Sequence, residues 1–135
     1  MSNIELRVIS PEEELFRGES QMVVIPGEEG DFAAMSQHSP LVTFLRPGKI
    51  EVYNNSNQVI ASYFSGSGFV KVDQNSCIIM TDYVKKLEEL DLKSIDSEIK
   101  KLQEEITAEV DSSIKEKLIE KSNILLAERD VAKTS

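Results

Sequence analysis

The sequence predicts a mainly β protein with α: a β-sandwich, or flattened barrel of short strands, over residues 1–86, followed by an antiparallel two-helix hairpin over residues 87–135. The first observation is compositional, because all six glycines, all four prolines and all eight aromatic residues (three Tyr and five Phe) lie at or before Tyr83. Turns and sheet cores use these residue types, whereas helices tolerate their absence. The second observation is that apolar residues alternate in the first part and recur every three or four positions in the second. A chain of 135 residues has room for one small domain with an appendage.

The first strand is indicated by Ile4, Leu6 and Val8, which alternate with charged residues. Such alternation is typical of a strand with one buried face. The following segment, SPEEELFRGE at residues 10–19, is interpreted as a polar connection.

The stretch from Ile25 to Ile50 contains most of the turn residues of the chain. It holds three of the four prolines, three of the six glycines and the only histidine, so we expect loops that present a surface. An apolar strand over residues 21–25 ends at Pro26 and Gly27, and a second tight turn follows at residues 30–31. A hairpin is therefore expected here.

Four further short strands are predicted at regular spacing after this stretch. They cover residues 49–53, 59–64, 69–72 and 77–80, and turn segments separate them: residues 54–57, SGSG and DQNS. SGSG is expected to connect two strands, because it lacks the Lys and Ser/Thr of a phosphate-binding loop and opens no helix. Since a sheet with two apolar faces must be covered on both, this spacing favours a sandwich or flattened barrel.

The first helix of the tail is predicted from Asp91 to Ala108, with Asp91 as its N-cap. The second is predicted from Ser113 to Ala132, because Ser113 and Glu116 match the spacing of a capping box. Each helix carries one narrow apolar stripe, so the two should pack against each other as a hairpin that is marginally stable and able to open. The stripes are Leu92, Ile95, Ile99, Leu102 and Ile106 on the first helix, and Ile114, Leu118, Leu125 and Ile119 on the second.

The formal net charge of -9 argues against nucleic acid and anionic lipid surfaces as partners. The first ten residues lack the basic and apolar regions of a signal peptide, and no run of 18 apolar residues occurs, so an intracellular soluble protein is expected. The single cysteine, Cys77, lies in the apolar run CIIM and is expected to be a buried, inert thiol.

No residue pattern predicts an enzyme or a cofactor. His38 is the only histidine, so no His/Cys cluster with metal-ligand spacing exists, and its pairing with Ser36 or Ser39 lacks the GxSxG pattern of a nucleophile elbow. The acidic groups at residues 12–14 and 28–31 are interpreted as solvated charge in polar turns. The residues alone thus indicate a protein that acts by contact, with a small hydrolase using His38 as a weaker reading.

The segment IPGEEGDFAAMSQHSPLVTFLRPGKIEV resembles the epsilon subunit of the F-type, proton-translocating ATP synthase in its order of turn Gly, EGD, His-x-Pro-Leu and Pro-Gly-x-Ile. NIELRVISPEEELFRGE before it, and SGSGFVKV, IIMTDYV and LDLKSID after it, follow the family's order over essentially the whole chain. The resemblance implies a sandwich followed by two helices and a rotor subunit without an active site or cofactor. It also implies contacts with the gamma subunit and the proteolipid ring, on the cytoplasmic side of the bacterial inner membrane. Membrane association would then occur only through the complex.

Carried over by position, the ring-facing residues are Glu29, Asp31 and His38. The family's helices in many bacteria also rise along the shaft and restrain ATP hydrolysis through basic residues that meet the catalytic alpha and beta subunits. The residues here that correspond in kind are Lys100, Lys101, Lys115, Lys117, Lys121 and Arg129. An autonomous acidic adaptor, whose sandwich and helices bind different proteins, is the alternative.

Two departures from the family pattern matter. Ala33, Ser36 and Gln37 stand where the family usually has a Gly and a Pro-Gly, so the loop lacks glycine's tolerance of positive φ. Some members bind ATP through Ile/Leu-Asp-x-x-Arg-Ala, but Ser94 and Ile95 replace Arg and Ala here. The missing guanidinium predicts no tight ATP binding.

Overall fold

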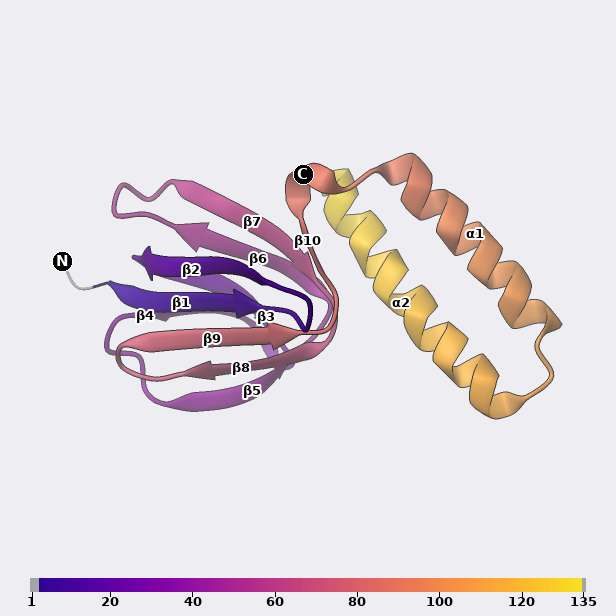
Figure 1. The fold of residues 1–135 in the computed structure, drawn as a ribbon, viewed down its shortest axis with the longest axis horizontal. Helices are drawn as coiled ribbons and strands as arrows, with labels where there is room; N and C mark the ends of the chain where they lie inside the picture. The colour runs from indigo at the N-terminus through magenta and orange to yellow at the C-terminus, as the bar shows by residue number, and fades with distance from the viewer. Residues whose placement is uncertain (1–2, 135) are drawn as a thin grey trace. The chain divides into compact units, whose positions relative to one another are not determined.

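The computed structural model describes residues 3–134 and consists of ten β-strands followed by two α-helices (Figure 1). The strands form one curled sheet in the order β10-β7-β6-β3-β5-β8-β9-β1-β2, and β4 pairs with β3 outside this path. The predicted sandwich or flattened barrel followed by two helices is confirmed. The strands are β1 (Ile4–Ile9), β2 (Glu14–Ser20), β3 (Met22–Gly27), β4 (Gly30–Met35), β5 (Leu41–Leu45), β6 (Gly48–Tyr53), β7 (Val59–Ser65), β8 (Gly68–Val72), β9 (Ser76–Thr81) and β10 (Val84–Lys86).

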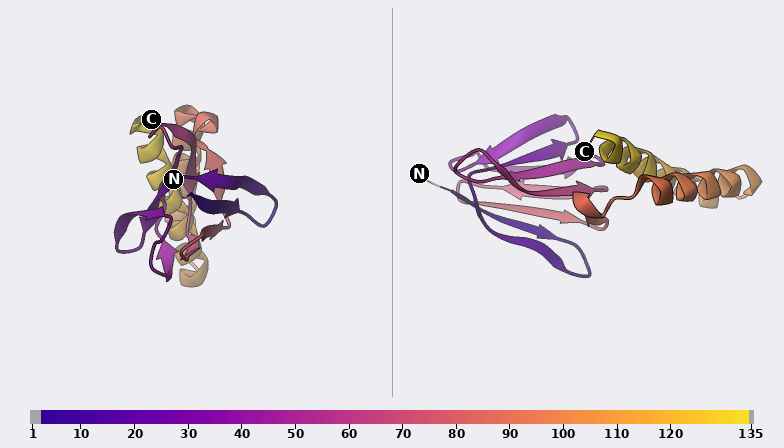
Figure 2. Two further views of the ribbon diagram at one scale, coloured as in Figure 1. Left: turned by 90° about the vertical axis from the view of Figure 1, so that its left-hand side faces the viewer. Right: turned by 90° about the horizontal axis from the view of Figure 1, so that it is seen from above.

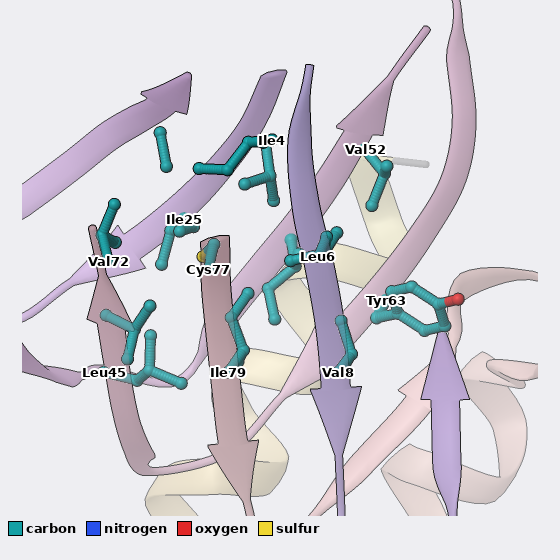
Figure 3. Packing of buried hydrophobic residues seen from close by; sticks show 14 residues of the cluster. Ile4, Leu6, Val8, Ile25, Leu45, Val52, Tyr63, Val72, Cys77 and Ile79 are labelled. Atoms are coloured by element: carbon teal, nitrogen blue, oxygen red, sulfur yellow. The ribbon is translucent and has the colours of Figure 1, made fainter. Parts of the chain in front are cut away.

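Curling brings two layers of strands face to face, with the apolar side chains between them (Figures 2 and 3). β1 pairs antiparallel with β2 and parallel with β9, which places Leu6 opposite Cys77 and Val8 opposite Ile79. These four side chains have no exposed surface. The residues that alternate in the sequence therefore lie together in one core, although their strands are far apart in the chain.

The predicted polar connection over residues 10–19 is wrong in its second half. Only residues 10–13 turn, where the Ser10 backbone N–H donates to the Glu13 carbonyl at 2.9 Å. From Glu14 the chain forms β2, an edge strand whose Leu15 and Phe16 pack against the core. The run of three glutamates at residues 12–14 resembles a polar turn. An edge strand can begin with such a residue, because its outer positions tolerate charge.

The expectation that residues 25–50 consist of loops is also wrong. β4 and β5 lie within this stretch, and the predicted hairpin is the β3–β4 hairpin, in which Gly27 pairs with Gly30. The prolines and glycines stand at strand ends. Ala34 of β4 and Leu45 of β5 are buried in the core, and β5 is the strand that the sequence interpretation missed.

The two helices form a unit of their own, since the chain divides into compact units between Lys86 and Leu87. α1 (Leu92–Ala108) and α2 (Ser112–Thr134) pack against each other through Ile95, Ile99, Leu102 and Leu125. A short 3₁₀ helix, η1 (Leu87–Glu89), precedes α1. The predicted hairpin is confirmed, and so is the Asp91 N-cap, whose carboxylate accepts from the Lys93 N–H at 3.2 Å.

The start and the stripe of α2 differ from their prediction. Asp111, not Ser113, caps the helix: its Oδ1 accepts from the N–H groups of Ser113 and Ile114 at 2.9 and 3.1 Å. An Asp at N-cap satisfies the first free N–H groups as well as a serine does, so the capping-box spacing was coincidental. Ile114 and Ile119 are exposed rather than part of the stripe.

No helix among residues 3–134 is both long enough and apolar enough to cross a membrane.

Candidate docking surfaces

The first surface is the tip of the β3–β4 hairpin. Glu28 and Glu29 form the two-residue turn, and Gly30 takes a φ of 136°, a conformation that glycine adopts without strain. The hairpin is closely packed, since a Cβ on Gly27 would lie 2.9 Å from the Gly30 carbonyl oxygen and from the Phe32 ring. The sequence EEGD at residues 28–31 therefore holds three acidic side chains on a closely packed, exposed tip.

Asp31 is the first acid after this turn, and it lies in β4 rather than in the turn where it was expected. Its carboxylate forms an ion pair with Arg46, and both side chains remain largely exposed. The backbone N–H of Arg46 donates to the Pro26 carbonyl at 3.0 Å, and the backbone N–H of Glu28 donates to the Phe44 carbonyl at 2.9 Å. These bonds tie the end of β5 to the hairpin, so Asp31 is positioned by a cation from a neighbouring element.

Beside this ion pair lies an open groove of about 290 Å³ between β4 and β5. Glu29 and Asp31 line it together with Phe32, Leu41 and Thr43. A groove lined by two carboxylates and by apolar side chains suits a partner loop better than it suits acid–base chemistry.

His38 lies past the other end of β4 and does not line this groove. Its Nδ1 is 2.6 Å from the Ser39 carbonyl oxygen, which only accepts, so Nδ1 carries the proton. The ring lies near Phe32, with 6.2 Å between ring centroids. The structure thus brings Glu29 and Asp31 into one groove and leaves His38 outside it.

The turn before His38 contains the residues that depart from the family pattern. Gln37 takes a φ of 71°, the left-handed conformation that a glycine would accept without strain. Its N–H donates to the Gln74 carbonyl at 2.8 Å, which fixes the turn against the β8–β9 connection. The loop therefore keeps a glycine-like course without a glycine.

A second surface was missed by the sequence interpretation. Phe44 of β5, Phe69 of β8, Met80 of β9 and Ile9 of β1 are register partners in neighbouring strands, and we call them the apolar row. The exposed fractions of Phe44, Phe69 and Met80 are 66%, 39% and 37%. Since Leu45, Val70 and Ile79 next to them are buried, strand alternation could have placed the row outside.

The apolar row borders a hollow of about 720 Å³ at one end of these strands. Pro11, Ser67 and Asp82 are among the other residues that line it. Large contiguous exposed apolar surface on a small domain usually marks a protein interface.

The basic residues expected to contact catalytic subunits divide into two kinds. Five of them are exposed lysines: Lys100, Lys101, Lys115, Lys117 and Lys121. Arg129 is instead half-buried, with Nη1 3.7 Å from Oδ1 of Asp96 on the other helix. Arg129 is therefore partly occupied within the hairpin.

In the segment that corresponds to the family's ATP pattern, the side chains of Ser94 and Ile95 have structural roles. The Ser94 hydroxyl donates to Oδ2 of Asp91 at 3.0 Å, and Ile95 is buried between the helices. Neither residue offers a donor for a phosphate group.

Cys77, expected to be an inert thiol, is buried in the sandwich core, and burial raises its pKa to about 12. It is therefore a thiol throughout the neutral range and a poor nucleophile.

Comparison with known proteins assigns the sandwich. The family model for "ATP synthase, Delta/Epsilon chain, beta-sandwich domain" matches residues 3–86. The ATP synthase epsilon chain of Rhodospirillum rubrum is 39% identical over 94 residues, which are 70% of this chain and 66% of that one. The epsilon chain of Parvibaculum lavamentivorans is 39% identical over 92 residues, 68% of this chain and 69% of that one. The chain thus spans about two thirds of the length of these relatives.

Solved structures agree in fold. A chain of the Euglena gracilis mitochondrial ATP synthase, solved as OSCP/F1/c-ring, matches 94% of this chain and 79% of its own length with a TM-score of 0.79 and 19% identity. A chain of the Tetrahymena thermophila mitochondrial ATP synthase central stalk and c-ring matches 64% of this chain and 68% of its own length, with a TM-score of 0.54 and 15% identity. Together with the family match over the whole sandwich, these findings show that the chain belongs to the delta/epsilon chain family of ATP synthases.

Proposed function

We propose that this chain is a non-catalytic rotor subunit of the central stalk of a proton-translocating ATP synthase, where it couples proton-driven rotation to ATP synthesis. The observation that carries the proposal is the family match over residues 3–86, the whole sandwich. Its place is on the cytoplasmic face of a bacterial inner membrane, held there through the complex. The chain spans about two thirds of the bacterial relatives that support this assignment.

The groove beside the β3–β4 hairpin is the proposed contact with the proteolipid ring. Asp31 is exposed yet held by Arg46, so its carboxylate is oriented before any partner arrives. Glu29 lines the same groove. His38 contributes separately, as a hydrogen-bonding ring on the neighbouring turn.

The apolar row is the proposed contact with the gamma subunit. It presents Phe44, Phe69 and Met80 on three adjacent strands and borders a hollow that could take a protruding side chain. Aromatic residues and methionine are the types that interfaces favour at their centres.

A charge swap tests the ring contact. Asp31→Lys should uncouple the purified complex, measured as less ATP-driven proton pumping per ATP hydrolysed. The double variant Asp31→Arg/Arg46→Asp restores an internal ion pair but reverses both charges. If the ring contacts the carboxylate at position 31, the double variant should stay uncoupled. Full recovery of proton pumping per ATP would mean that only the internal ion pair matters, and it would contradict the ring contact.

Cysteine crosslinking tests both contacts independently. Cys77 is buried with a raised pKa, so an introduced cysteine is the only reactive thiol among residues 3–134. Asp31→Cys should crosslink to the ring and Phe44→Cys to gamma. Crosslinks with the partners exchanged would overturn the assignment of the two surfaces.

The helical hairpin is proposed to restrain ATP hydrolysis through its exposed lysines and Arg129, which meet the catalytic subunits when the helices extend. Thirteen acids in residues 88–135 oppose long-range attraction, so the contacts must be short-range. A complex containing a chain truncated after Glu88 should hydrolyse ATP faster than the intact complex. An unchanged rate would leave the hairpin without this role.

Regulation by bound ATP is not part of the proposal, because Ser94 and Ile95 serve the cap and the helix packing. Calorimetry should show no micromolar ATP binding to the isolated chain.

An autonomous adaptor is the rival function. A rotor subunit should co-purify with a gamma subunit in stoichiometric amount, whereas an autonomous adaptor should not.

A further inference from the structure

The two helices of the hairpin contribute unequally to the surface on which they meet. α1 supplies Ile95, Ile99, Leu102 and Ile106, all apolar. α2 has its matching positions at steps of four and three, and they hold smaller or polar residues as well as leucine. Those positions are Leu118, Ser122, Leu125, Arg129 and Ala132.

Arg129 is the largest polar residue at these α2 positions and its contacts are incomplete. It makes one ion pair, at 3.7 Å, with Asp96, whose side chain is 54% exposed. Its Nε is buried and has no hydrogen-bond acceptor within residues 3–134. A guanidinium has five N–H donors, and a buried donor without an acceptor costs the desolvation that a hydrogen bond would offset.

This arrangement is weaker than an apolar side chain would be. The ion pair does little to offset this cost, because the side chains of Arg129 and Asp96 are 33% and 54% exposed, and an ion pair this open to solvent contributes little. A leucine at position 129 would leave no buried N–H donor without an acceptor. Leucine and arginine also have similar helix propensities, so the difference between them at position 129 reflects packing and solvation.

We propose that Arg129 sets how readily the helical hairpin opens, by destabilising the closed form at the position where α2 meets Asp96 of α1. When the helices separate, the guanidinium regains full hydration and becomes available to a carboxylate-bearing partner surface. The effect on opening concerns the chain alone. Only the use of the freed guanidinium rests on the proposed restraint of ATP hydrolysis.

Hydrogen exchange of the full chain tests the effect on opening. Arg129→Leu should slow exchange of the amides of α1 and α2 by roughly tenfold, because it removes a buried donor without an acceptor and helix amides exchange through opening of this unit. Lys121→Leu is the matched control: it removes the same charge from an exposed position of α2 and should leave the exchange rates within about twofold. Unchanged or faster exchange in Arg129→Leu would overturn the proposal.

A substitution of Asp96 provides a second test of the proposal, and this test does not depend on how well a leucine packs at position 129. Asp96→Asn should speed exchange by no more than a few-fold in the natural background, because it removes the exposed ion-pair partner of the arginine. In the Arg129→Leu background the same change should have no effect. An equal effect in both backgrounds would show that Asp96 acts independently of Arg129 and would contradict the proposal.

The assembled complex separates this inference from the proposed function. If the hairpin restrains hydrolysis, Arg129→Leu should weaken the restraint, both by holding the hairpin closed and by removing the guanidinium, whereas truncation after Glu88 abolishes it. If truncation changes nothing, the restraint is wrong, while slower exchange in Arg129→Leu would still support the role of Arg129 in opening.

Discussion

The sandwich and the hairpin of this chain both have cores of aliphatic side chains but bury them to very different extents. The sandwich core contains 14 buried residues, nearly all without exposed surface, drawn from strands throughout residues 4–79 (Figure 3). The hairpin core has four, Ile95, Ile99, Leu102 and Leu125, each retaining 4 to 5% exposure. Apolar burial supplies most of the free energy of folding, so the sandwich should be the stable unit and the hairpin the one that opens first.

The difference suits the roles proposed for them. A surface that transmits rotation needs fixed side chains, and Asp31 and the apolar row lie on strands of the stable unit. A part that regulates by changing shape needs a small free energy difference between its forms. The buried Ser122 and the incompletely paired Arg129 keep the hairpin near that condition.

Truncating a sandwich core residue should produce the largest effect. Leu6→Ala removes a side chain without exposed surface from β1, between β2 and β9, and should cost about 2–5 kcal/mol of the free energy of unfolding of the sandwich. Urea unfolding followed through tyrosine fluorescence measures it, because all three tyrosines lie in residues 1–86. A loss below 1 kcal/mol would mean that the core is less continuous than the structure indicates.

The corresponding truncation in the hairpin should be smaller and should not spread. Leu102→Ala should cost about 2 kcal/mol, at the low end for such changes, because the thin hairpin can relax around the missing atoms. Circular dichroism at 222 nm should show helix loss at lower temperature, while the fluorescence transition of the sandwich stays unchanged. A parallel shift of both transitions would show that the two units unfold together.

Replacing Gln37 tests a weak point within the stable unit. Gln37→Gly should stabilise the sandwich by up to about 1 kcal/mol, because relief of the φ of 71° slightly exceeds the added flexibility of glycine in the unfolded chain. Gln37→Ala is the control, since alanine suffers the same strain and should be close to neutral. Destabilisation by the glycine would show that flexibility outweighs strain at this turn.

Most of the architecture could be predicted because local patterns and tertiary burial agree. The alternation of Ile4, Leu6 and Val8 and the three-four spacing of the α1 stripe each describe a surface that the fold buries. β2 could not be recognised, because an edge strand has only one neighbour and its glutamates resemble a turn. β5 was not recognised because turn residues at strand ends look the same as turn residues within loops.

The candidate sites could be predicted less well, because they depend on which strands become neighbours. Asp31 and Arg46 are 15 positions apart and meet only because the end of β5 returns to the β3–β4 hairpin. The apolar row combines residues from positions 9 to 80, and no local pattern links them. The ion pair of Arg129 with Asp96 could not be predicted, since it depends on how α2 is rotated against α1.

The smallest expected effect is that acid lowers the stability of the sandwich, but not that of the hairpin, through Asp73. Asp73 lies in the β8–β9 turn, where its carboxylate accepts from the backbone N–H groups of Asn75 and Ser76 and from the Ser76 hydroxyl at 2.8 to 3.0 Å. These hydrogen bonds, with a further contribution from the positive charge of Lys71, hold the pKa of Asp73 below its usual value. A pKa lower in the folded state means that the carboxylate adds stability above the unfolded pKa of about 3.9 and loses it as the pH falls through the folded value.

Wild type should therefore be more stable than Asp73→Asn at pH 7, and the difference should shrink below about pH 4, because the protonated acid and the amide are then both neutral. Ser76→Ala removes one of the donors to the carboxylate and should weaken the pH dependence without abolishing it. The change should appear in the fluorescence transition of the sandwich and leave the helix transition at 222 nm in place. An equal acid shift in both transitions would mean that the turn supports the hairpin as well, and that the two units are less independent than their separate cores indicate.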